Sequence, residues 1–168
     1  MNEGDSTMKK ELIGVVIMVV SVAGFISEST ALAAEKDTDA VHRAVKEFYS
    51  ALNVMFTGEV GPMKEIWSHA DDVTYMGPGG GFLVGWKQVL PEWERQAALK
   101  LGGKVEPKEM RVTVGRDLAI VRNYEVGENL VDGKPRKVKI RVTSLFRNEN
   151  GKWKMIGHHA DLLPYLQK

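Results

Sequence analysis

The chain has 168 residues, of which 43% are hydrophobic and 27% are charged, and its formal net charge is +1. This length fits one domain with a short additional segment, and the small net charge argues against a nucleic-acid-binding protein. The sequence contains no Cys, which excludes a disulfide framework, a thiolate nucleophile and a cysteine-ligated zinc site.

The N-terminal segment has the order of a secretory signal peptide. A basic start at Met8-Lys9-Lys10 precedes an apolar run from Leu12 to Ile26, and the small residues Ala31-Leu32-Ala33 follow. The apolar run is shorter than the roughly 20 residues that a membrane-spanning helix requires. We therefore expect a cleaved signal over residues 1–33, with residues 1–7 as an upstream extension, and a periplasmic or secreted domain over residues 34–168. An uncleaved membrane anchor and a soluble N-terminal helix are the alternatives.

A helix is predicted at the start of the mature chain, where apolar residues recur at helical spacing. They are Val41, Val45, Phe48, Leu52 and Met55. Capping side chains precede this stripe at residues 37–39, and Gly58 is expected to end the helix.

Two further helices are predicted before the strands. The first is expected over Met63 to Ala70, opened by Pro62. The second is expected from Gly85 to Leu101, with Pro91 inside it. Because proline removes a backbone hydrogen bond from a helix, we expect a kink there, or a main helix that starts near Pro91.

The remaining elements are predicted to be strands. A short strand at Val73 to Met76 leads into a glycine-rich loop over residues 77–81, which indicates a mobile rim. Asp132-Gly133 and Asn150-Gly151 are signals for tight antiparallel hairpins. Four strands are expected around them, at Val105 to Val114, Leu118 to Val131, Val138 to Arg147 and Lys152 to His159. Helices followed by an antiparallel sheet predict an α+β fold with the helices on one face.

Several short motifs occur in a characteristic order over roughly Asp39 to Pro164. They are FYSALN (residues 48–53), WSHADDVTY (67–75), Gly77-Pro78, Gly85-Trp86, Arg141-Val142-Thr143, Gly151-Lys152-Trp153 and His159-Ala160-Asp161. This order resembles the nuclear-transport-factor-2-like superfamily, with its SnoaL-like and ketosteroid-isomerase-like members. The resemblance implies a cone-shaped α+β barrel, in which N-terminal helices pack on a curved, mainly antiparallel sheet around a pocket. It also implies a homodimer through the outer face of the sheet.

Two positions depart from the steroid isomerases of this superfamily. Gly77 stands where those enzymes place a general-base Asp, and Phe48 stands where they place an oxyanion-hole Tyr. Steroid-isomerase activity is therefore not implied. The calcium/calmodulin-dependent kinase association domains, which the chain also resembles, have a pocket histidine after a Gly-Lys-Trp strand, and that histidine falls on His159.

His159 is the first candidate for chemistry, because an imidazole with a pKa near neutral acts as an acid, a base or a hydrogen-bond donor. Asp161 would orient the imidazole or act itself, and Arg141 would clamp an anionic group. The structural alternatives are a histidine that merely closes a strand and a solvated arginine within a basic strand.

Strand alternation separates the two adjacent histidines. Trp153, Met155, Gly157 and His159 are predicted to share one face of the last strand, and His158 is predicted to lie on the other. Adjacent histidines on opposite faces cannot bind the same ion without distortion, so neither a metal site nor a cofactor is predicted. On the preceding strand, hydrophobicity indicates three buried residues, Ile140, Val142 and Phe146.

Aromatic residues are the candidates for pocket walls, since they combine an apolar body with a polar tip. They are Tyr49, Trp67, Tyr75, Trp86, Trp93 and Tyr124. Taken singly, each is also explained as an ordinary core residue.

Three functions are compatible with these patterns. The first is an exported domain that binds a small hydrophobic or weakly anionic molecule in an apolar pocket without catalysis. The second is an isomerase, dehydratase or hydrolase that uses His159 with Asp161 or Arg141. The third is a periplasmic interaction domain with a filled core. No nucleic-acid partner is expected, and membrane contact is expected only through an uncleaved N-terminal segment.

Overall fold

The computed structural model describes residues 35–167. The fold described below belongs to the unit Thr38–Lys168, and residues 35–37 belong to a separate unit. The predicted signal peptide over residues 1–33 lies outside the described residues. Within residues 35–167, no helix is both long and apolar enough to cross a membrane.

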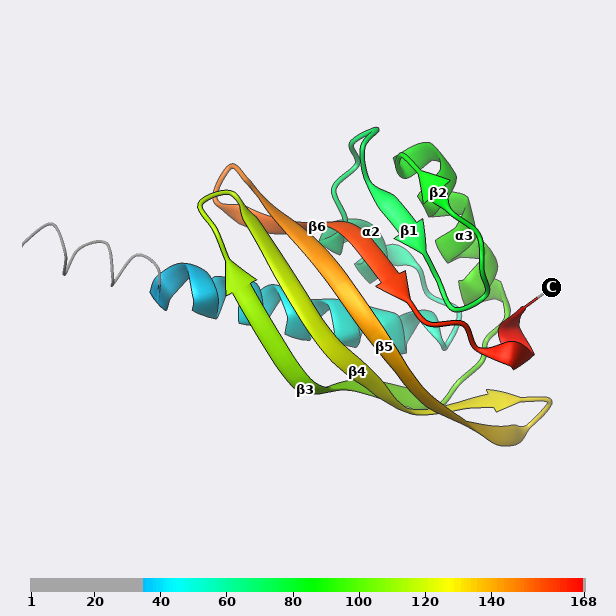
Figure 1. Ribbon diagram of the computed structural model, residues 1–168. Coiled ribbons are helices and arrows are strands. Elements are labelled where there is room, and N and C mark those ends of the chain that lie inside the picture. Colours follow the sequence, from blue (N-terminus) through cyan, green and yellow to red (C-terminus); the bar gives the residue numbers. More distant parts are fainter. Residues whose placement is uncertain (1–34, 168) are drawn as a thin grey trace, which may run out of the picture. The chain divides into compact units, whose positions relative to one another are not determined.

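A curved six-stranded sheet forms the body of the unit Thr38–Lys168 (Figure 1). Its strands lie in the order β2-β1-β6-β5-β4-β3, and β1 runs parallel to β6 while the other neighbours are antiparallel. The strands are β1 (Thr74–Met76), β2 (Leu83–Val84), β3 (Lys104–Val114), β4 (Leu118–Val131), β5 (Lys134–Glu149) and β6 (Lys152–Ala160). All the predicted strands are present, β5 is longer than predicted, and β2 was not predicted.

The two predicted hairpin turns are confirmed. Asp132 and Gly133 have φ values of 52° and 71°, and Asn150 and Gly151 have φ values of 54° and 81°. Two successive residues with positive φ make the tight turn whose twist matches that of the adjoining strands. These turns fix the register of β4, β5 and β6, and thereby the side chains that face each other across the sheet.

Three helices pack with the sheet. The N-terminal helix, described here over residues 38–55, lies across one face of the sheet (blue to cyan in Figure 1). It is followed by α2 (Gly61–Ile66) and α3 (Trp86–Ala98). A short 3₁₀ turn, η1 (Pro164–Leu166), lies near the C-terminus. These helices and the mostly antiparallel sheet confirm the predicted α+β fold.

Two helix boundaries differ from the prediction. The helix expected to reach Ala70 ends at Ile66, because Trp67 adopts an extended backbone and forms a bridge with Met155 of β6. The α3 helix continues from Trp86 through Pro91 to Ala98, so the expected start near Pro91 is wrong.

The core lies between the helices and the inner face of the sheet. The whole apolar stripe of the N-terminal helix is buried, as predicted. On β5, the predicted burial of Ile140, Val142 and Phe146 is also confirmed. On β4, the alternate residues Ala119, Val121, Asn123 and Glu125 are buried, so the inner face of this strand carries two polar side chains.

A β-bulge at Ile156 reverses the predicted faces at the end of β6. Phe146 pairs with Met155, but the next residue back, Leu145, pairs with Gly157, so Ile156 has no partner on β5. One extra residue shifts strand alternation by one position. The predicted common face of Met155 and His159 is therefore wrong: His158 follows Met155 onto the inner face, and His159 lies outside.

Candidate functional site

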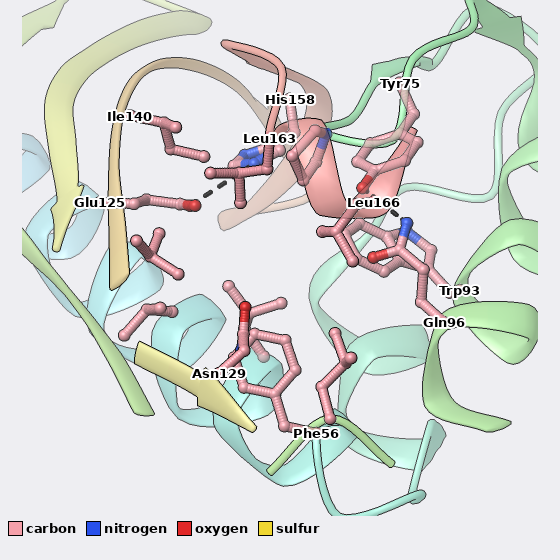
Figure 2. Close-up of a pocket in the computed structure, with 15 residues that line it drawn as sticks. Phe56, Tyr75, Trp93, Gln96, Glu125, Asn129, Ile140, His158, Leu163 and Leu166 are labelled. Carbon is pink, nitrogen blue, oxygen red and sulfur yellow. Dashed lines mark hydrogen bonds and ion pairs between the residues drawn. The ribbon is translucent and has the colours of Figure 1, made fainter. Parts of the chain in front are cut away.

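A small internal cavity lies between the inner face of the sheet, the N-terminal helix, α3 and the C-terminal turn (Figure 2). Its volume of about 30 Å³ is room for about two water molecules. Its wall is mainly apolar but includes a few polar side chains. The lining residues are Leu52, Phe56, Tyr75, Pro78, Trp93, Gln96, Leu101, Val105, Glu125, Asn129, Val138, Ile140, His158, Leu163 and Leu166.

Glu125 and His158 face each other in the wall of this cavity. Glu125 is 5% exposed and His158 is 2% exposed, and 3.6 Å separates Glu125 Oε1 from His158 Nε2. The other ring nitrogen of His158, Nδ1, lies 3.1 Å from the hydroxyl of Ser144. Glu125 Oε1 has no hydrogen-bond partner. The cavity therefore contains a buried carboxyl oxygen that a bound molecule would be able to reach.

Burial shifts the pKa of each group in the direction that favours its neutral form. Desolvation raises the pKa of Glu125 to about 7, and the nearby Tyr49 hydroxyl opposes part of this rise. Desolvation lowers the pKa of His158 to about 3, and the neighbouring His159 adds to this effect. Near neutral pH, a neutral imidazole thus lies beside a carboxyl group that is close to half protonated. Such a pair can accept or donate a proton.

Tyr49 on the N-terminal helix and Asn123 on β4 form a hydrogen-bonded pair next to Glu125. The Asn123 amide donates a hydrogen bond of 2.7 Å to the Tyr49 hydroxyl and another of 2.9 Å to the carbonyl of Tyr124. Burial and the nearby Glu125 raise the pKa of Tyr49 above its usual range, so its hydroxyl keeps its proton. Phe48 packs against His158 with 4.9 Å between ring centroids, which adds to the apolar surroundings of the imidazole.

Tyr75 fills the space that a side chain at Gly77 would need. A Cβ atom built on Gly77 would lie 2.1 Å from the Tyr75 hydroxyl oxygen, which is far inside van der Waals contact. Gln96 donates a hydrogen bond of 2.8 Å to that hydroxyl, which fixes it at the cavity wall. An Asp side chain at position 77 would therefore have no room in this structure, because Tyr75 occupies that space.

Most of the chain matches a known protein family. The model of the SnoaL-like domain family matches residues 41–164. The chain belongs to the SnoaL-like family. No curated protein sequence matches it.

Solved structures share the fold of this SnoaL-like domain. One is an NTF2-like protein from Streptomyces avermitilis, provisionally named a dehydratase, with 24% identity, a TM-score of 0.69, and coverage of 77% of this chain and 98% of the other. Another is a provisionally named calcium/calmodulin-dependent protein kinase II association domain from Thiobacillus denitrificans, with 25% identity, a TM-score of 0.61, and coverage of 71% and 92%. A provisionally named ketosteroid isomerase from Shewanella frigidimarina has 20% identity, a TM-score of 0.61, and coverage of 73% and 94%.

The predicted pocket aromatics of the SnoaL-like domain occupy four environments. Tyr75 and Trp93 line the cavity, and Tyr49 lies next to Glu125. Trp67 and Trp86 stack on each other with 6.4 Å between centroids, outside the cavity wall. Tyr124 alternates with the inward residues of β4 and lies on the outer face, where Lys139 Nζ is 5.8 Å from its ring.

The three residues first considered for chemistry lie outside the cavity of the SnoaL-like domain. His159 Nε2 lies 3.0 Å from the Thr74 hydroxyl, and burial lowers its pKa. Arg141 is bound by Asp161 through hydrogen bonds of 2.8 and 3.0 Å, and its side chain is 77% exposed. Among residues 35–167, no group of three His, Asp or Glu side chains is arranged to hold a metal ion.

Sequence reasoning overlooked Glu125 and His158. A signal existed for Glu125, because Ala119 and Val121 alternate on the buried face of β4 and the same alternation continues through Asn123 to Glu125. His158 gave no such signal, since its inward position depends on the bulge at Ile156.

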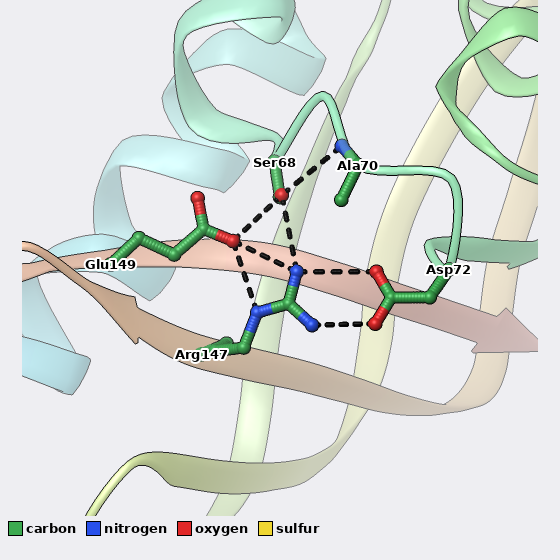
Figure 3. A network of polar contacts seen from close by, with 5 residues as sticks. All are labelled: Ser68, Ala70, Asp72, Arg147 and Glu149. Carbon is green, nitrogen blue, oxygen red and sulfur yellow. Dashed lines mark hydrogen bonds and ion pairs between the residues drawn. The ribbon is translucent and has the colours of Figure 1, made fainter.

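A second polar cluster joins the segment after α2 to β5 (Figure 3). Arg147 donates two hydrogen bonds to Asp72, of 2.6 and 3.2 Å, and two to Glu149, of 3.0 and 2.9 Å. The buried Ser68 hydroxyl donates to Glu149 at 2.8 Å and accepts from the backbone N–H of Ala70 at 3.3 Å. This cluster fixes the segment that leads into β1, and thereby the position of Tyr75 in the cavity wall.

Proposed function

We propose that this SnoaL-like domain binds a small, mainly apolar molecule in the cavity, and that Glu125 hydrogen-bonds a hydroxyl or carbonyl oxygen of that molecule. The unpartnered oxygen of the buried Glu125 carries this proposal. A buried polar group without a partner costs about 1–3 kcal/mol of stability, which an apolar side chain in its place would avoid. A ligand oxygen at this position would provide the missing partner.

The apolar wall supports a mainly hydrophobic ligand. Around Glu125, the cavity is lined mostly by aliphatic and aromatic side chains, which is typical of small-molecule sites with one or two orienting polar groups. With a pKa of about 7, Glu125 is able to donate a hydrogen bond when protonated and to accept one when ionised. The proposed ligand class is therefore an apolar alcohol, ketone or related compound rather than a strong anion.

The C-terminal turn must move for such a ligand to enter. Leu163 and Leu166 close one side of the cavity, whose present volume is too small for an organic molecule. Two hydrogen bonds attach this segment to the rest of the fold, from Leu163 N–H to the carbonyl of Pro78 at 2.9 Å and from the Tyr165 hydroxyl to Asn129 Oδ1 at 3.2 Å. The proposal therefore includes displacement of this turn when the molecule enters.

Proton-transfer catalysis is the second candidate, and the facing pair of Glu125 and His158 favours it. A group with a pKa near the working pH is the most effective general acid or base. In this alternative the domain is an enzyme of the isomerase or dehydratase kind, with Glu125 as the group that takes or gives the proton. His158, whose pKa burial lowers to about 3, would stay neutral beside Glu125 while the proton moves between Glu125 and the bound molecule.

The proposed function is tested by mass spectrometry of small molecules that copurify with the full chain. We expect a bound molecule with the wild type and at least roughly a tenfold loss with Glu125→Leu, which cannot hydrogen-bond the ligand. The matched control is Glu47→Gln, at an exposed position of the N-terminal helix, which should retain the molecule. The binding proposal is wrong if Glu125→Leu retains it fully or if the wild type carries none.

The same preparation separates binding from catalysis. Incubation in D₂O should introduce deuterium at carbon into the recovered molecule only if the domain transfers protons. Glu125→Gln should then stop the exchange while retaining the molecule, because an amide preserves hydrogen bonding but does not titrate. Loss of exchange with His159→Ala and not with Glu125→Gln would instead support the site on the outer face.

Export and a homodimer form part of the proposal. The signal-like order of residues 1–33 supports export. The outer face of the sheet supports dimerisation, since Leu118 and Ile120 are exposed there by 54% and 40%. We expect the exported protein to begin at Ala34 and to have twice the mass of one chain by light scattering. An intact N-terminus in the exported protein and a monomer mass would contradict these two expectations.

A further inference from the structure

Three segments meet at one side of the cavity and contribute residues to its wall, and together we call them the cavity rim. They are the α3–β3 connection (residues 99–103), the β4–β5 hairpin (129–139) and the C-terminal segment (161–167). The N–H of Leu130 donates to the carbonyl of Leu101 at 2.7 Å, and the Tyr165 hydroxyl donates to Asn129 at 3.2 Å. Figure 1 shows the hairpin in yellow and the C-terminal segment in red at the same end of the molecule.

Each segment of the cavity rim exposes a large apolar side chain. Leu99 is 47% exposed, Leu130 is 43% exposed and Leu162 is 52% exposed. The glycine-rich loop adds Phe82, which is 63% exposed. Its Gly80 approaches the rim, since a Cβ there would lie 3.8 Å from Leu162 Cδ2. These side chains are single tips on separate segments rather than one flat apolar patch.

Exposed cations belong to two of the same segments. Lys100, Lys134, Arg136 and Lys137 are all exposed, and none of them forms an ion pair with a carboxylate in the described part of the chain. The rim also contains two acids, Asp132 and Asp161, and Arg141 already pairs with Asp161. The rim is therefore positively charged as well as apolar.

We propose that the cavity rim docks on an anionic lipid bilayer. Apolar side chains insert into the boundary between headgroups and acyl chains, while Lys and Arg remain at the level of the anionic headgroups. Apolar side chains on separate segments, with exposed cations on two of those segments, fit this layered medium, whereas a folded protein partner is usually met by a continuous, well-packed apolar centre. Clustered Lys and Arg near an anionic membrane are each attracted to its surface.

Docking in this orientation would place the movable wall of the cavity against the lipid. Leu163 and Leu166, which close the cavity, belong to the same C-terminal segment as the exposed Leu162. A mainly apolar molecule would then pass between bilayer and cavity without crossing water. This consequence depends on the proposed ligand binding, whereas docking of the rim does not, so the two fail separately.

The absence of Cys from the chain allows a local test in the full-length protein. Leu162→Cys is labelled with an environment-sensitive fluorophore, and Lys87→Cys, at the opposite end of α3 from the rim, is the matched control. With phosphatidylcholine vesicles that contain phosphatidylglycerol, we expect the label at position 162 to brighten and shift to shorter wavelength, and the label at 87 to remain unchanged. High salt should reverse the response because it screens the charges.

A charge-reversal pair tests the role of the cations. Lys134→Glu with Lys137→Glu should weaken vesicle partitioning of the 162-labelled protein by at least about thirtyfold, because removal of two lysines from an anionic surface alone has that effect and the two new carboxylates are repelled by it. Lys46→Glu with Lys87→Glu, which leaves the rim intact, should have little effect. The proposal is overturned by an equal response to pure phosphatidylcholine, by an unchanged response in the rim variant, or by a response to polyglutamate but not to vesicles. It is also overturned if the protein binds vesicles while the label at 162 stays in water, since residues 1–34 would then be the anchor.

Discussion

The Glu125→Gln variant is expected to unfold with a higher free energy than the wild type above pH 7, and with a similar one below pH 4.5. The carboxyl of Glu125 ionises near 4.5 in the unfolded chain but near 7 in the folded protein, because burial raises its pKa. Between these values the unfolded state loses its proton while the folded state keeps it, so the stability of the wild type falls as the pH rises. The difference amounts to about 3 kcal/mol once the pH exceeds 7. Glutamine does not titrate and escapes this loss.

Urea denaturation on both sides of this pH window measures the effect. The exposed Glu47→Gln is the control for loss of one acid, and it should not reproduce the gain above pH 7. If Glu125→Gln gains no stability there, the Glu125 carboxyl is not held in an apolar site, and the proposed hydrogen bond to a ligand loses its physical basis.

The His158→Asn variant is expected to lose less stability in acid than the wild type does. Burial lowers the pKa of His158 from 6.5 to about 3. Below pH 6.5, His158 therefore binds a proton in the unfolded chain but stays neutral in the folded protein. The stability present above pH 6.5 is therefore lost as the pH falls toward 3, by about 5 kcal/mol in total. Asparagine keeps a polar group next to Ser144 but does not titrate.

The slope of unfolding free energy against pH is the quantity to measure, because His158→Asn also removes ring packing against Phe48 and Tyr75. His42→Asn, at an exposed position of the N-terminal helix, controls for loss of one imidazole and should keep the acid slope. A variant that becomes unstable in acid as steeply as the wild type would show that His158 is accessible to protons in the folded state.

The two effects have opposite signs where their ranges overlap. Between pH 4.5 and 6.5, Glu125 is protonated in the folded protein but ionised in the unfolded chain, whereas His158 is neutral in the folded protein but protonated in the unfolded chain. The contributions of these two groups to the stability of the wild type should therefore nearly cancel in this range, while each single variant reveals the contribution of the other group. A variant in which the contribution of the remaining group is absent would show that this group binds protons equally well in the folded and unfolded states.

Regular patterns allowed most of the fold to be predicted. The helical stripe from Val41 to Met55 and the two positive-φ turns are local signals, and each depends only on neighbouring residues. The end of α2 was missed because it depends on a long-range contact, the bridge between Trp67 and Met155. Long-range pairing of this kind leaves no period in the sequence.

The candidate site was harder to predict from the sequence than the fold, for the same reason. Tyr75 and Trp93 were found because large aromatics are natural pocket walls. Glu125 was available from the alternation of β4 but was overlooked in favour of the titratable residues at the end of the last strand. His158 and His159 exchange faces through the bulge at Ile156, and nothing in the local composition marks that residue as the one without a partner.

The bulge also affects how members of this fold can diverge. Because Ile156 is the residue without a partner on β5, its deletion would make β6 regular and would leave His158 on the inner face. Loss of the bulge with Ile156 retained would instead turn His159 inward and His158 outward. Relatives with the same residues at this strand end but no bulge would therefore present a different imidazole to their cavities.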